Sequence, residues 1–299
     1  MRLPNPLQAQ VEALARELLA PPSSPPVDFA APRGEPALVA AQSVSWRVCK
    51  NPVTLFIGGI AAVLLELAEP RVRHGVWDHS SFGAEPLQRL QRTGVAAMVT
   101  VYGAASQARA MIAGVTRRHG MVSGVTPEGE AYDALDPELL NWVHSTAAYG
   151  FLEAYISYAR MLNLEERDAY WGESRPVAAL FGAQASPGSE AEWAMLLDRM
   201  RPRLGSSAIL FEFLAIMRRV SALPRYARPA QHLLIKAAVE ILPAGIAEQL
   251  GLTPQWRLHG WERALVRMMA KSADRLVLEA WPSVQACRRL GLPDDHLYR

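Results

Sequence analysis

The chain has 299 residues, half of them hydrophobic, and its formal net charge at pH 7 is only +2. That length supports a sizeable core in one large domain or two closely packed ones. So small a net charge excludes the strong electrostatic field expected of a protein that binds nucleic acid or an anionic membrane. Nearly all the basic residues are arginine, and the chain is also rich in alanine. This composition is typical of GC-rich bacterial genes and carries little physical information.

The cysteines and the apolar runs indicate the compartment. Cys49 and Cys287 are far apart in the sequence and form neither a metal-binding spacing nor a disulfide framework. The first residues are charged and then amphipathic rather than uniformly apolar, so no secretory signal is predicted. The most apolar run, residues 53–65, has 13 residues, whereas a membrane-spanning helix needs about 20. We therefore expect a cytoplasmic protein without a transmembrane segment.

The N-terminal region differs in composition from the remainder. Residues 4–20 place apolar side chains on one helical face and predict a short surface helix. Residues 21–36 are rich in proline and serine, which predicts a loop or an extended arm. We expect this region, residues 1–37, to precede one large helical domain over residues 38–299.

A buried helix is predicted to begin at Asn51, the N-cap, and Pro52, the first helical residue. Gly58 and Gly59 inside this helix each cost about 1 kcal/mol relative to alanine. A close contact is therefore expected there, either with a neighbouring helix or with a flat, bulky group. Pro70 is expected to end the helix.

An irregular connector is expected to follow and to lead into a helix over residues 86–102. Val95, Met98, Val99 and Tyr102 have the spacing of one apolar helical face. On the same predicted helix, Arg89 and Thr93 are four residues apart and share a face one turn apart. Arg89 and Thr93 therefore point toward a common region.

The next two predicted helices each carry one histidine on an apolar stripe. The first spans residues 106–122 and its stripe reaches His119; the second spans residues 137–162, is capped by Asp136, and its stripe contains His144. The remaining segments are also amphipathic helices with glycine and proline breaks, and no alternating strand pattern of useful length occurs. The sequence predicts an all-α fold of about ten helices.

A single histidine on an apolar stripe is ordinarily a hydrogen-bonded core residue, because an unpaired buried ring costs about 1–3 kcal/mol. Two such helices in succession, with Arg89 and Thr93 on the helix before, make a binding pocket a stronger interpretation. Imidazole is a good ligand for haem iron, and arginines such as Arg118 suit haem propionates. The sequence has no HExxH, ExxH or CxxC pattern and no phosphate-binding glycine loop. The core-residue and haem interpretations both stay open at this point, because the ligand pattern has no unique spacing.

Six sequence pieces, in this order, resemble one family of oxygenase catalytic domains. The pieces are LLELAEPRVRHGV, HSSF, PLQRLQRT, RRHGMVSG, GEAYDALDPELLNWVHST and ILPAGIAEQLGL, and they cover residues 50–255. Together they are similar to the family of the latex-clearing rubber oxygenases and the oxygenase of mycophenolic acid biosynthesis. The resemblance implies a single all-α domain with a globin-like core that holds b-type haem.

The resemblance also implies roles for particular residues. His119 matches the proximal haem ligand and would bind the iron, and His144 matches a pocket-wall histidine that is the alternative ligand. Arg89 and Thr93 match the distal arginine and threonine. Arg92 stands where rubber oxygenase has an iron-capping lysine, and a permanently protonated guanidinium cannot bind iron as a neutral amine.

The resemblance implies a haem b-dependent oxidoreductase of the oxygenase type. Its partners would be dioxygen and a small apolar substrate of the isoprenoid or lipid-like class, with no nucleic acid. Dehydrogenase and peroxidase chemistry are equally compatible with these residues. The alternatives are a non-enzymatic helical protein that binds haem or an apolar ligand, and a structural bundle whose histidines only fill the core. The sequence does not specify the substrate, the distal ligand or the oligomeric state.

Overall fold

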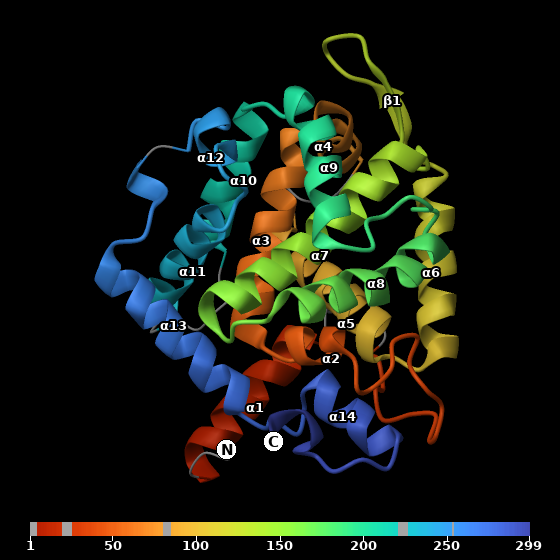
Figure 1. Ribbon diagram of the computed structural model, residues 1–299, viewed down its shortest axis with the longest axis vertical. Helices are drawn as coiled ribbons and strands as arrows, with labels where there is room; N and C mark the ends of the chain where they lie inside the picture. Colours follow the sequence, from red (N-terminus) through yellow and green to blue (C-terminus); the bar gives the residue numbers. More distant parts are fainter. Residues whose placement is uncertain (1–4, 20–25, 80–84, 221–226, 253) are drawn as a thin grey trace.

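The computed structural model describes residues 5–19, 26–79, 85–220, 227–252 and 254–299 (Figure 1). Within these ranges the chain forms fourteen α-helices and one two-stranded sheet, so the predicted all-α class is confirmed. The helices are α1 (Asn5–Leu19), α2 (Val44–Cys49), α3 (Pro52–Ala68), α4 (Pro70–Trp77), α5 (Pro86–Tyr102), α6 (Ala105–His119), α7 (Pro137–Tyr158), α8 (Leu164–Leu180), α9 (Glu190–Met200), α10 (Ala208–Arg219), α11 (Arg228–Glu240), α12 (Ile246–Gln249), α13 (Gly260–Arg275) and α14 (Pro282–Arg289).

Several helix boundaries follow directly from local sequence signals. The Asn51 side chain accepts hydrogen bonds from the first backbone amides of α3, and the Asp136 side chain does the same for α7. Asn163 forms a reciprocal capping box with Glu166 at the start of α8. The predicted helix over residues 86–102 has the same bounds in the structure.

The described chain has fourteen helices where about ten were expected, and two segments differ from the structure predicted for them. The segment after Pro70, expected to be an irregular connector, begins with helix α4. Pro70 fits the first helical position, and the Glu69 carboxylate caps the helix by accepting from the Val72 amide at 2.9 Å. Between α6 and α7, strand β1 (Ser123–Val125) pairs antiparallel with β2 (Ala131–Asp133), although no strand was expected. Three-residue strands are too short to show an alternating pattern.

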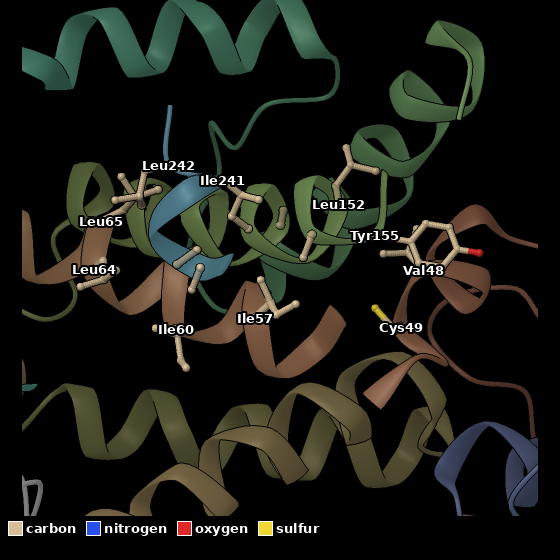
Figure 2. Close-up of a cluster of buried hydrophobic side chains, with 14 of the residues drawn as sticks. Val48, Cys49, Ile57, Ile60, Leu64, Leu65, Leu152, Tyr155, Ile241 and Leu242 are labelled. Atoms are coloured by element: carbon tan, nitrogen blue, oxygen red, sulfur yellow. The ribbon is translucent and has the colours of Figure 1, made fainter. Parts of the chain in front are cut away.

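The centre of the molecule is the pair α3 and α7, which has the most extensive helix contact in the described chain. Gly58 of α3 lies against Gly150 of α7. Further along α3, the Leu65 carbonyl accepts a hydrogen bond from the indole of Trp142, which is earlier on α7, at 3.2 Å. The two helices therefore run in opposite directions. Figure 2 shows the apolar cluster here, in which α3 and α7 side chains meet residues that follow α11.

The remaining helices surround this pair (Figure 1). Helices α10, α11 and α13 pack on α3, α13 and α8 pack on α7, and α9 packs on α8. Helices α5 and α6 pack on each other, and α5 also contacts α1, α2 and α14. The α5–α6 hairpin is therefore anchored by the outer helices.

The N-terminal region packs against the end of the described chain. The Glu12 carboxylate of α1 accepts from the backbone amides of Glu279 and Ala280, at 2.5 and 2.8 Å. The buried Arg289 guanidinium of α14 donates to the carbonyls of Phe29 and Glu35 at 2.7 and 2.8 Å. The described part of the expected extended arm is non-helical, as predicted, and residues 21–25 of it lie outside the described ranges.

No single helix in the described chain combines the length and the apolar composition needed to cross a membrane. Helices α3 and α4 together are long and apolar enough, judged by length and composition alone. The two helices are bent by 111° relative to each other.

Candidate functional site

The two predicted histidines are neighbours in the structure. His119 is the last residue of α6 and His144 lies in the first half of α7, and both side chains are half-buried. Burial lowers the pKa of both imidazoles. Burial, with a smaller contribution from the charge of His119, lowers the pKa of His144 to about 4. Both rings are therefore neutral near pH 7, and the two are close enough to interact electrostatically.

Arg89 joins these histidines from a third helix, α5. Its half-buried guanidinium interacts electrostatically with His119, and this charge contributes to the lowered pKa of the imidazole. Burial also lowers the pKa of Arg89 itself, and the charge of Glu66 opposes that effect. Arg89 therefore lies within electrostatic range of both His119 and Glu66.

Glu66 of α3 is a fourth member that the sequence analysis missed. Burial raises the pKa of its carboxyl to about 7, against the charge of Arg89 and the influence of the Thr146 hydroxyl of α7, which both lower it. The only sequence signal was an acid inside the apolar segment LLELAEP. A carboxyl with this pKa can gain or lose a proton close to neutral pH.

The other predicted residues are placed less centrally. Thr93 is exposed, and its hydroxyl donates to the Arg89 carbonyl of its own helix at 3.0 Å. Arg92 is half-buried, and its charge lowers the pKa of Arg89. Arg118 is exposed beside His119 and lowers the pKa of that imidazole. The catalytic roles of Thr93 and Arg92 stay predictions.

Helices α3 and α7 each carry a row of half-buried positions although both are central to the fold. The rows have three- or four-residue spacing and consist of Phe56, Gly59, Val63 and Glu66 on α3, and His144, Ala147 and Phe151 on α7. A Cβ built on Gly59 would meet only the Phe151 ring, at 4.0 Å, and the His144 ring lies 4.5 Å from the Phe181 ring. The two rows therefore give the central helices a partly accessible face, and burial shifts the pKa of Glu66 upward and that of His144 downward at this face.

The side chains at this face fit a haem. Iron binds the neutral form of imidazole, which is the form that burial favours here for His119 and His144. The apolar members of the two rows suit the faces of a porphyrin, and Arg118, exposed beside His119, has the charge that pairs with a propionate. The described residues contain no group of three or more His, Cys, Asp or Glu side chains that could hold a metal ion, and a haem iron needs only one or two axial protein ligands.

The sequence was also compared with known proteins. A family model described as "ER-bound oxygenase mpaB/B'/Rubber oxygenase, catalytic domain" matches residues 46–271. No curated protein and no solved structure gives a significant match. The matched range extends from α2 into α13 and includes Glu66, Arg89, His119 and His144. The resemblance found in the sequence is confirmed.

Proposed function

The chain belongs to the family of mpaB and rubber oxygenase catalytic domains, and from this premise we propose that it is a haem b-dependent oxidoreductase of the oxygenase type. Its proposed substrates are dioxygen and an apolar molecule of the isoprenoid or lipid-like class. An oxygenase-type enzyme is what the family itself indicates. The haem and the substrate class are the further steps of the proposal.

The observation that carries this proposal is the convergence of four side chains from four helices. His119 interacts electrostatically with both Arg89 and His144, and Arg89 interacts with Glu66. Buried ionisable groups with strongly shifted pKa values are concentrated at functional sites. A structural bundle would not need to gather a carboxyl, a guanidinium and two imidazoles beside partly accessible apolar faces.

The protein groups would divide the work as follows. A haem, when bound, supplies the oxidative chemistry. His119 would hold the iron through its neutral imidazole, and His144 would complete the wall beside it. Arg89 provides a fixed positive charge that can orient or stabilise a polar oxygen species by hydrogen bonding. Glu66, with its pKa of about 7, can hold a proton or release it at the same place.

The substrate would meet a largely apolar face. Phe56, Val63 and Phe151 are half-buried on the central helices, and an apolar chain placed against them would remove their remaining surface from water. Burial of apolar surface contributes roughly 25 cal/mol per Å². This contribution favours an isoprenoid or lipid-like molecule over a polar one.

An absorption spectrum of the purified, haem-supplemented protein tests the cofactor, because bound haem gives a Soret band. Dioxygen consumption with an isoprenoid or fatty-acyl substrate then tests the activity. We expect a Soret band in proportion to protein and substrate-dependent oxygen uptake. A protein that holds haem without turnover under these conditions would be a haem-binding protein, and one that stays colourless would contradict the proposed cofactor.

A further inference from the structure

A cavity of about 560 Å³ lies away from the histidines, where the C-terminal ends of α2, α7 and α13 meet the short turn His296–Tyr298. Its lining is strongly basic. The arginine and lysine side chains that line it are Arg47, Lys50, Arg160, Lys271, Arg275 and Arg299, and His296 is also part of the wall.

The lining of the cavity contains fewer acidic than basic residues. Asp274 is the acidic residue in the lining. Outside the lining, Glu166 forms an ion pair with Arg47 at 2.9 Å, and Asp295 forms one with Arg299 at 2.8 Å. Three of the lining cations, Arg47, Lys50 and Arg299, are therefore paired with a carboxylate. Within the described ranges, no carboxylate forms an ion pair with Arg160 or Lys271.

One wall of the cavity is built from buried groups. The Lys50 side chain is only 4% exposed, and its ammonium lies 3.1 Å from the Asp274 carboxylate and 4.5 Å from the centre of the Tyr298 ring. The Tyr155 hydroxyl donates to the same carboxylate at 3.4 Å. These contacts fix Lys50 and Asp274 in place, while Arg160 and Lys271 are exposed at the rim.

We propose that this cavity binds a small organic polyanion, held by phosphate or carboxylate groups against Arg160, Lys271 and the buried Lys50. Like charges gathered in one concave site repel one another, and a bound anion removes that repulsion. The volume lies within the usual range of small-molecule sites, about 300–1,000 Å³. Ala159, Leu297 and the Tyr298 ring provide an apolar wall for the uncharged part of the ligand.

The proposed anion site is separate from the histidine cluster. Tyr155, in the cavity wall, follows His144 on the same helix by eleven residues, which corresponds to about 16 Å along α7. The site therefore does not depend on whether the histidines hold a haem. Helix α7 connects the two places directly.

The test measures binding of two probes, pyrophosphate and tricarballylate, by isothermal titration calorimetry at one fixed ionic strength. The variant is Arg160→Gln/Lys271→Gln, and a charge-matched control is Arg109→Gln/Arg199→Gln, which changes exposed arginines on α6 and α9. We expect the control to bind like the wild type and the cavity variant to bind at least tenfold more weakly. The preferred probe distinguishes a phosphate ligand from a carboxylate ligand.

Thermal unfolding gives an independent readout that requires no ligand. At low ionic strength, the cavity variant should melt at a higher temperature than the wild type, because two repelling charges are gone, and added probe should raise the wild-type melting temperature. The single variant Lys271→Gln should melt at a temperature between those of the wild type and the double variant, and added probe should raise its melting temperature less than that of the wild type. Equal binding by all the proteins, or no binding of either probe at millimolar concentration, would overturn the proposal.

Discussion

Gly58 and Gly150 bring the two central helices into backbone contact. A Cβ built on Gly58 would lie 2.5 Å from the Gly150 carbonyl oxygen and 2.8 Å from the Phe151 Cα, distances that real Cβ atoms do not adopt. The neighbouring Gly59 has no such contact, since the nearest atom to its Cβ would be in the Phe151 ring at 4.0 Å. Of the two alternatives that the Gly58-Gly59 pair suggested, a neighbouring helix is the one found at Gly58.

Gly58→Ala should therefore destabilise the protein, because the inserted methyl group must push apart two backbones. We expect a loss of about 1–3 kcal/mol in the free energy of unfolding, measured by urea denaturation. Gly59→Ala is the matched control, and it should be neutral or stabilising by up to about 1 kcal/mol, because alanine is the better helix former. Equal losses in both variants would contradict the close contact at Gly58.

The choice between the two histidines can be tested by haem retention. His119→Ala should abolish or strongly reduce the haem that stays with the protein after gel filtration, and His144→Ala should reduce it less. His232→Ala, at an exposed position on α11, is the control and should retain wild-type haem. If His144→Ala lost more haem than His119→Ala, the axial ligand would have been assigned to the wrong helix.

Glu66 should make stability depend on pH. Its pKa is about 7 in the fold against 4.5 for an ordinary carboxyl, so the folded chain binds the extra proton between these values. Wild-type stability should fall as the pH rises from about 4.5 to 7, and Glu66→Gln should remove this loss. The variant should gain, relative to the wild type, on the order of 1–3 kcal/mol over that interval. Glu212→Gln, at an exposed position, is the control and should show no such gain. If stability changed with pH in the same way in the wild type and in Glu66→Gln, the raised pKa of Glu66 would be refuted.

His144 should give the opposite dependence. Its pKa is about 4 in the fold against 6.5 for an ordinary imidazole, so the unfolded chain binds the extra proton between these values. Stability is therefore complete above about pH 6.5 and is lost as the pH falls toward 4. We expect the His144 ring protons in an NMR titration to shift near pH 4, and His144→Gln to flatten the acid limb of the stability curve. A titration midpoint near pH 6.5 for the His144 ring protons would mean that the ring is solvated, and it would contradict the lowered pKa.

Arg89 should affect turnover more than haem content. Its charge lowers the pKa values of both Glu66 and His119, so Arg89→Gln should raise both. Turnover per bound haem should fall at least tenfold, consistent with the loss of one charged donor, and the pH profile of the remaining activity should move upward. Arg109→Gln, exposed on α6, is the control. Unchanged turnover per haem would remove the role proposed for Arg89.

Much of the fold could be predicted because its signals are local. Asn51, Asp136 and Asn163 mark helix starts through cap hydrogen bonds that need only adjacent residues. Helix α4 was missed because Pro70, which ends α3, also begins the next helix under the Glu69 cap. The sequence pattern alone does not distinguish a proline that stops a helix from one that starts the following helix.

The site was only partly predictable. His119 and His144 could be selected because each lies on an apolar helical stripe, and Arg89 because it shares a helical face with Thr93 and matches a distal arginine in the resemblance. In the structure His119 is within electrostatic range of both Arg89 and His144. Glu66 could not be selected from the sequence. It stands out only by its raised pKa, which is set by burial and by residues of α5 and α7 that the sequence does not place beside it. The basic cavity was invisible for the same reason, since its cations come from separate elements and the net charge of the chain is only +2.

The guanidinium of Arg289 has a consequence for how this chain can be trimmed. It joins the carbonyls of Phe29 and Glu35 to α14, and Glu12 makes a second such bridge to the backbone after α13. Both bridges use residues outside the matched range 46–271. Proteolysis or truncation on one side would leave a buried polar group unsatisfied on the other. The two flanks should therefore be kept or removed together in any expression trial.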